Sequence, residues 1–466
     1  MHIRTVRHPH ASLFQSIIDN VLHRNQGPGT SRPTLEDPHV HAATIAAEHL
    51  AAGRELPADA PAAIANLPGG QKAWACIKLA AELLGAKVLR QHARADELER
   101  IFKDGTCDPG WLETIRVYLD YYGLSGHKHA VRYIPCRHDG SYACDTLPPS
   151  ATVLLIGDWA TGTALAKGLL REAASHDPDI LIHLGDIYYA GTLHEAQANF
   201  LDVCNDVFDR SGGRLAIYNL AGNHDMYSGG VGYFDTLPRL NPAPPFLPEQ
   251  AQRASYFSLR NPSNRFQLLA MDTGLHDADP FTVSTDVTWL EQAEADWLVR
   301  QIDSFASNGG RTILLSHHQL FTAFEAIGDP TTRTPELSAY NPNLLQTFKG
   351  VLEKDQVLAW FWGHEHNCAV YEPYGPLERG RCIGHGAIPI PKDTDPYVPD
   401  PRIVNPPRLV TDPKTSEPLR LPLDPAGEMY RHGYVILRLN DALGTATAEY
   451  YVGGEPETPF YTETLV

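Results

Sequence analysis

The sequence of 466 residues contains no apolar run long enough to cross a lipid bilayer, which takes about 20 residues of helix. Its N-terminal segment has basic side chains and two short apolar patches. It lacks the continuous hydrophobic stretch and small-residue cleavage site of a secretory signal. We therefore expect no transmembrane segment and a cytoplasmic protein, or the trimmed form of a periplasmic or secreted one.

Basic residues are scarce, because 38 Lys and Arg face 56 Asp and Glu, for a formal net charge of −18. Proteins that bind nucleic acids draw affinity from many Lys and Arg contacts to phosphates, so we expect no nucleic-acid partner. A glycine-rich nucleotide loop of the Walker type is also missing. Small phosphate esters remain open as substrates, because bound metal cations reverse the local sign of the charge.

Cysteines are few and irregularly spaced. The seven cysteines match neither a metal knuckle nor a disulfide framework. We expect mostly buried thiols, with a bridge between Cys136 and Cys144 as the minor alternative.

The chain is longer than one ordinary hydrophobic core requires, which indicates two domains. Residues 1–145 show helical spacing of apolar side chains and no cluster of potential ligands. They are predicted to form a mainly α-helical accessory region, with substrate gating or partner docking as the alternative role. Residues 146–466 are predicted to form a catalytic domain. Within it, residues 388–425 carry eleven prolines and are expected to be an irregular loop or cover.

From about residue 150 the sequence alternates between strand-like and helix-like segments. The apolar runs are nearly continuous, as in strands that are buried on both faces. One helix is expected over Ala164–Ala174, between the first two strands. The strands are expected at Thr152–Gly157, Ile180–Gly185, Arg214–Ala221, Phe266–Met271, Thr312–Ser316, Val357–Gly363, Tyr434–Leu439 and Thr447–Val452.

Five short motifs each follow one of these runs, and each offers a hard metal ligand. Ligands gather at the carboxyl ends of strands in open α/β sheets, so these distant residues are expected to meet at one rim. Aspartate, asparagine and histidine in this order predict a hydrolase that uses two metal ions. The motifs are Gly157-Asp158, Gly185-Asp186-Ile187-Tyr188-Tyr189, Gly222-Asn223-His224-Asp225, Ser316-His317-His318 and Gly363-His364-Glu365-His366.

This series of motifs resembles the calcineurin-like metallophosphoesterase superfamily, and the pair of Asp186 and Tyr189 resembles its purple acid phosphatase branch. The resemblance implies an α/β fold, a four-layer sandwich of two packed sheets flanked by helices. It also implies two metal ions, Fe together with Zn, Mn or a second Fe. The implied activity is that of a purple acid phosphatase-like phosphomonoesterase, in which metal-bound hydroxide attacks phosphorus directly.

The resemblance also assigns the metal ligands, with Asp186 as the carboxylate that bridges both ions. His317 is preferred to His318, because in the family the ligand directly follows the small residue, here Ser316. Tyr189 replaces the histidine that most of the superfamily has where this chain has Ala160, and Tyr188 is expected to pack. The first metal would take Asp158, Asp186, Tyr189 and His366, and the second would take Asp186, Asn223, His317 and His364.

Two further residues receive catalytic roles from the resemblance. His224 is expected to contact the phosphate and assist the leaving group, and Asp225 to orient its ring. Plant-type relatives carry additional histidines after the His317 position, whereas residues 319–345 contain none. His385 either supplies an imidazole from another loop or packs within its own. His183 is expected to be buried and hydrogen-bonded, and Asp272 to support the site without binding metal.

The substrate stays open between phosphomonoesters and phosphodiesters of the cyclic nucleotide or phospholipid type, because loops and not ligands select among them. The competing class is a non-catalytic scaffold that retains the fold. Such a protein should have lost ligands, whereas this chain keeps the full set, so we favour an enzyme that acts on a small phosphate ester. The sequence leaves the oligomeric state open.

Overall fold

The computed structural model describes residues 147–278, 287–328, 338–388 and most of 390–466, with a few positions before residue 147. The chain divides into two compact units, Met1–Val117 and Tyr118–Val466, and the elements described here belong to the second. The predicted helical region at residues 1–145 lies almost wholly outside the described residues, as does Cys136. Within the described part, no helix combines the length and the apolar content that a membrane span needs.

One sheet has six strands in the order β15-β14-β13-β2-β3-β4. The strands β2, β3 and β4 run parallel to one another, while β13 pairs antiparallel with both β2 and β14. Its strands are β2 (Ser150–Ile156), β3 (Ile180–His183), β4 (Ala216–Asn219), β13 (Gly433–Asn440), β14 (Thr445–Val452) and β15 (Tyr461–Thr464).

The other large sheet has seven strands in the order β1-β5-β6-β7-β8-β10-β9. The central strands β6, β7 and β8 are parallel, with Leu314 of β7 opposite Leu269 of β6 and Trp360 of β8. The strands are β1 (Ala143–Cys144), β5 (Phe257–Arg260), β6 (Phe266–Ala270), β7 (Arg311–Leu315), β8 (Val357–Trp362), β9 (Cys368–Val370) and β10 (Gly380–Ile383). A separate pair joins β11 (Ile390–Pro391) to β12 (Met429–Tyr430).

Helices connect these strands and cover the sheets. The helix α7 begins after Thr163, whose side chain accepts a hydrogen bond from the amide of Ala166, a typical N-cap. The remaining helices are α8 (Leu193–Glu195), η1 (Ala196–Leu201), α9 (Asp202–Val207), α10 (Asn223–Met226), α11 (Val231–Leu240), η2 (Pro248–Gln250), α12 (Gln292–Ser307) and α13 (Pro342–Leu352), while α7 spans Ala164–Ala174.

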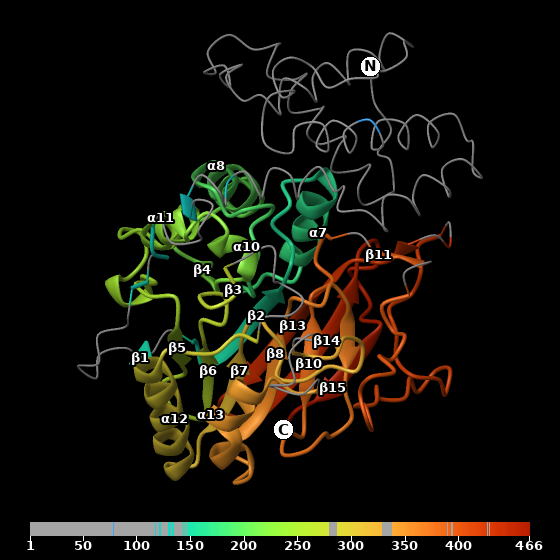
Figure 1. The fold of residues 1–466 in the computed structure, drawn as a ribbon. Helices are drawn as coiled ribbons and strands as arrows, with labels where there is room; N and C mark the ends of the chain where they lie inside the picture. The colour runs from blue at the N-terminus through green and yellow to red at the C-terminus, as the bar shows by residue number, and fades with distance from the viewer. Residues whose placement is uncertain are drawn as a thin grey trace. The chain divides into compact units, whose positions relative to one another are not determined.

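Alternation along the strands builds four layers. In β2, Val153 and Leu155 join a core between the two sheets, while Leu154 and Ile156 face a second core that includes residues of α7, α9 and α11. A third core packs α12 and α13 on the outer face of the seven-stranded sheet, where Figure 1 shows them beside β5, β6 and β7. The predicted four-layer α/β sandwich is confirmed.

The strands and the helix that the long apolar runs predicted are present in the structure. All eight predicted strands are present, with ends that differ by a few residues, and α7 has the predicted bounds. The short strands β1, β5, β9, β10, β11, β12 and β15 were not predicted. In the described part of residues 388–425, regular structure is confined to β11 and scattered bridges, as expected for an irregular loop. Among the described residues, Cys204, Cys368 and Cys382 are free thiols and buried, as expected for most of the cysteines.

Candidate metal centre

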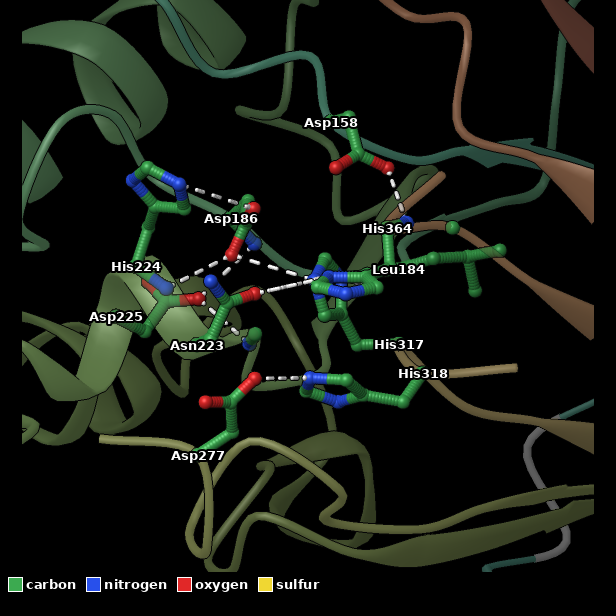
Figure 2. Close-up of polar contacts among 12 residues, drawn as sticks. Asp158, Leu184, Asp186, Asn223, His224, Asp225, Asp277, His317, His318 and His364 are labelled. Carbon is green, nitrogen blue, oxygen red and sulfur yellow. Dashed lines mark hydrogen bonds and ion pairs between the residues drawn. The ribbon is translucent and has the colours of Figure 1, made fainter. Parts of the chain in front are cut away.

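The five motifs lie at strand ends and meet at one place, between the two sheets (Figure 2). Asp158, Asp186 and Asn223 follow β2, β3 and β4 of the six-stranded sheet. His317 and His364 follow β7 and β8 of the seven-stranded sheet. Each sheet therefore contributes ligand candidates from the carboxyl ends of its parallel strands.

One cluster joins His317, Asn223 and His364. His317 Nδ1 lies 2.9 Å from the carbonyl oxygen of Leu184, to which it donates, so the lone pair is on Nε2. That Nε2 lies 3.0 Å from Asn223 Oδ1, 3.3 Å from His364 Nδ1 and 3.4 Å from Asp186 Oδ1. The amide nitrogen of Asn223 donates to Tyr227 at 2.6 Å, which turns its oxygen to the histidines. Lone pairs thus converge on one point, as they do around a cation.

His318 is held elsewhere. The hydroxyl of Thr273 accepts a hydrogen bond from the backbone amide of His318 and lies 3.1 Å from Nδ1 of its ring. The ring's Nε2 lies 2.9 Å from Asp277 Oδ2. Both ring nitrogens therefore have partners, although the ring lies 4.3 Å from that of His364, and ligand atoms of His317, His318 and His364 lie within 4.8 Å of one another. The choice of His317 over His318 stays a prediction, which these partners of His318 favour.

The other cluster surrounds the hydroxyl of Tyr188. This oxygen lies 2.9 Å from Asp158 Oδ1, 3.0 Å from Asp186 Oδ2 and 3.0 Å from His366 Nε2. A phenol has a single hydrogen, and ionised carboxylates only accept hydrogen bonds. One proton does not satisfy these partners together, so this cluster too has the donor atoms that a cation would bind. Asp158, Asp186 and His366 alone bring ligand atoms within 4.8 Å of one another.

The tyrosine at this cluster differs from the one expected. The sequence prediction placed Tyr189 on the first metal and treated Tyr188 as a packed neighbour. In the structure Tyr188 presents its hydroxyl to Asp158 and Asp186, while the ring of Tyr189 lies 6.4 Å from that of His224. The backbone amide of Tyr189 donates to Glu195, and its carbonyl oxygen faces His224. The hydroxyl at this cluster is therefore that of Tyr188, whereas the sequence prediction named Tyr189 as the ligand.

His224 points one ring nitrogen towards Asp186, which both clusters share. Its Nδ1 donates to the carbonyl oxygen of Tyr189 at 2.6 Å, which leaves Nε2 3.9 Å from Asp186 Oδ2. Asp225 was expected to orient this ring. Its Oδ2 instead accepts hydrogen bonds from the backbone amides of Asp186 at 3.0 Å and Gly222 at 2.8 Å. Asp225 therefore joins the ends of β3 and β4, and the backbone at Tyr189 holds His224.

Burial and neighbouring charges set the ionisation of the cluster. Burial alone would raise the pKa of Asp186, but the positive charges of His317, His224 and His366 outweigh it and lower that pKa to about 2. Burial and the neighbouring histidine charges lower the pKa of His364 well below its usual value. Burial also lowers the pKa of His318 to about 4. A low pKa favours the ionised carboxylate at Asp186 and the neutral imidazole at His364, which are the protonation states that metal ligands need.

The backbone at these strand ends is bent into an uncommon conformation. Asp158, Asp186, His364 and His366 have φ values of 53°, 74°, 68° and 49°, in the left-handed region that residues other than glycine seldom adopt. Glycine leaves room for the ligands, because a Cβ on Gly363 would lie 2.5 Å from Asp158 Oδ2. Strain of this kind concentrates at functional sites.

Three predicted supporting residues lie around the clusters. His183 is fully buried with Nδ1 2.8 Å from Asn219 Oδ1, as expected. Asp272 lies two residues after β6 and next to Thr273, whose hydroxyl contacts His318, and its supporting role stays a prediction. His385 is fully buried against Gly433 of β13, and burial lowers its pKa to about 3. These contacts favour the packing alternative for His385.

Sequence reasoning missed several residues of the site. Tyr227 fixes the amide of Asn223 and stands four residues after it, a spacing that brings side chains together on a helix. Asp277 fixes His318, and Glu365 is bonded to Thr322 and Trp362. Asp277 stands 41 residues from its partner, so no local pattern predicts that contact.

Two sheets that bring candidate metal ligands to the carboxyl ends of their strands are the arrangement that the motifs predicted. Residues 151–368 match the family described as calcineurin-like phosphoesterase. The resemblance predicted from the motifs is confirmed.

Several solved structures are similar to part of this chain at low sequence identity. A purple acid phosphatase from yellow lupin (Lupinus luteus) seeds has 13% identity and a TM-score of 0.42, over 68% of this chain and 53% of that one. A dimetal phosphatase from Danio rerio has 14% identity and a TM-score of 0.41, over 68% of this chain and 99% of that one. The anchor of the Plasmodium inner membrane complex has 11% identity and a TM-score of 0.39, over 68% of this chain and 88% of that one.

The chain thus spans about half the length of the lupin protein. No curated protein matches the sequence.

Proposed function

We propose that this protein is a phosphomonoesterase of the purple acid phosphatase type that works with two metal ions. The observation that carries this proposal is the pair of lone-pair clusters that share Asp186. The first metal would be held by Asp158, Asp186, Tyr188 and His366. The second would be held by Asp186, Asn223, His317 and His364.

The donor set indicates which metals fit. A phenolate oxygen with two carboxylates is a hard, anionic set, so we propose Fe at the site of Tyr188. The site of Asn223, His317 and His364 offers an amide oxygen and two imidazoles, which suit Zn, Mn or Fe. When bound, the metals would activate a water molecule as nucleophile and neutralise the charge of the phosphoryl group.

The residues of the chain would position the ester and move a proton. His224 is held at Nδ1 by the carbonyl oxygen of Tyr189, and its Nε2, on the side of Asp186, would contact the phosphoryl group and protonate the leaving oxygen. Asp225 holds the backbone of Asp186 and Gly222, and so fixes the spacing of the strand ends. Asp277 and Thr273 hold the ring of His318, which packs beside the ring of His364.

A phosphodiesterase of the cyclic nucleotide or phospholipid type is the second candidate, because the ligand set serves both ester classes. A scaffold without activity is disfavoured, because each predicted ligand position except that of Tyr189 presents its side chain to one of the clusters. Purified protein assayed on a phosphomonoester and on a matched phosphodiester would rank the two enzymatic candidates.

The bridging role of Asp186 provides the test of the proposal. Asp186→Ala should lose both metals and reduce ester hydrolysis to background, because each cluster loses the carboxylate that they share. Metal content and hydrolysis are measured on the same preparation. The control is Asp296→Ala on the exposed side of α12, which should change neither. A variant at Asp186 that kept two metals and full activity would overturn the assignment.

A further inference from the structure

Glu365 stands between two ligand candidates, His364 and His366, and has no part in the chemistry described above. Its Oε1 accepts a hydrogen bond from the hydroxyl of Thr322, and its Oε2 accepts one from the indole nitrogen of Trp362 at 3.0 Å. Thr322 and Trp362 are both fully buried. The carboxylate is therefore fixed at both oxygens by donors that belong to the protein core.

The turn that carries Glu365 is strained on both sides. His364 and His366 have φ values of 68° and 49°, and such conformations persist only where the surrounding structure enforces them. The backbone amide of His364 donates to Asp158 Oδ2 at 2.8 Å, and that of Glu365 donates to the carbonyl oxygen of Gly363 at 2.8 Å. The side chain of Glu365 adds two bonds that reach outside the turn.

We propose that Glu365 is the positioning residue that holds this turn so that one imidazole faces each metal. His364 belongs to the cluster of Asn223 and His317, and His366 belongs to the cluster of Tyr188. A single anchor between them thus serves both metals. The inference rests on the proposed function, because it concerns the same two metal sites.

This role predicts a joint effect on the two metals. Loss of one ligand histidine removes a donor from one cluster, whereas release of the turn displaces both histidines together. Residues that orient metal ligands typically change metal affinity by about 10–100-fold when they are replaced. We expect Glu365→Ala to weaken both metals by a factor in that range.

The conservative variant separates positioning from charge. In Glu365→Gln, the amide oxygen accepts the hydrogen bond of Trp362, and the amide nitrogen donates to the hydroxyl of Thr322. This variant should therefore bind both metals nearly as tightly as the wild-type protein. The variant Thr322→Val removes one of the two anchors and should weaken both metals less than Glu365→Ala does. Glu372→Ala, at an exposed position, is the surface control.

The experiment is a calorimetric titration of the metal-stripped full-length chain with Mn²⁺, with folding of each variant checked by circular dichroism. The inference is supported if both affinities fall in Glu365→Ala and return in Glu365→Gln. It is overturned if Glu365→Ala binds both equivalents like the wild type, or if only one affinity falls. Should Glu365→Ala fail to fold, unchanged affinities in Thr322→Val would overturn it. Wild-type protein that binds no Mn²⁺ contradicts the proposed metal centre instead, so the two failures are distinguishable.

Discussion

Two adjacent tyrosines bear on which metal the cluster around Tyr188 would hold. The hydroxyl of Tyr188 lies among Asp158, Asp186 and His366, while the carbonyl oxygen of Tyr189 holds His224. Burial and the charges of Asp158 and Asp186 raise the pKa of Tyr188 well above its usual value. A phenol in this place ionises only beside a strong cation. The sequence shows that a tyrosine follows Asp186, and backbone geometry determines which of the two reaches the cluster.

The tyrosine assignment gives a spectroscopic prediction. In protein loaded with Fe(III), Tyr188→Phe should abolish the visible phenolate-to-iron band and weaken iron binding, because the charged oxygen ligand is lost. Tyr189→Phe should keep the band, since its side chain is not assigned to the metal. Absorption spectra of the two variants at equal iron content provide the measurement. A band that survives in Tyr188→Phe and vanishes in Tyr189→Phe would restore the assignment expected from the sequence.

His224 should act mainly on poor leaving groups. His224→Ala should retain both metals and lose about 10²–10⁴-fold in rate on an alkyl phosphate, the usual range for a positioned acid or base. The loss should be smaller on p-nitrophenyl phosphate, whose leaving group departs without a proton. Turnover rates for both esters provide the measurement, with His194→Ala at an exposed position of α8 as control. Equal losses on the two esters would show that His224 binds the phosphate and is not the acid.

At the scale of elements, the part of the site that the sequence predicted is the part that lies at the ends of strands. The long apolar runs before Asp158, Asp186, Asn223, His317 and His364 predicted both the strands and the meeting of their ends. Short strands such as β9 and β10 carry too few residues for a periodic pattern. The contacts of Asp225 and Asp277 depend on how separate loops pack, so they could not be deduced from neighbouring residues.

The end of β6 contributes a pH-dependent term to stability. Burial raises the pKa of Asp272 from 3.8 to about 6. Between these values the folded state binds more protons than the unfolded state, so the free energy of unfolding falls as the pH rises from about 4 to 6. The shift corresponds to about 3 kcal/mol. Asp272→Asn cannot ionise, and its side-chain oxygen can still accept the hydrogen bond from the amide of Leu275.

Urea unfolding of metal-stripped protein at a series of pH values tests this term. The difference in unfolding free energy between Asp272→Asn and wild type should change by about 3 kcal/mol in favour of the variant as the pH rises through this window. The exposed control Asp296→Asn should show no such change. A difference that stays constant with pH would mean that Asp272 does not carry the term.

At the scale of the catalytic domain, both sheets contribute residues to the proposed metal centre. The six-stranded sheet supplies Asp158, Asp186 and Asn223, and the seven-stranded sheet supplies His317 and His364. The core that joins the sheets includes Leu155 of β2 and Leu315 of β7, close in sequence to ligands on both sides. Packing between the sheets therefore sets the spacing of the clusters. The sequence predicted this architecture because each ligand motif directly follows a buried strand.

The most direct test of the account is hydrolysis of p-nitrophenyl phosphate by metal-stripped full-length protein, measured as Mn²⁺ is added stoichiometrically at protein concentrations above the binding constants. The proposed mechanism needs a metal ion in each of the two clusters that share Asp186. Activity should therefore be absent without metal and rise to a plateau at two equivalents per chain. A plateau at one equivalent, or no hydrolysis at any loading despite binding of two ions, would contradict the proposed two-metal phosphoesterase.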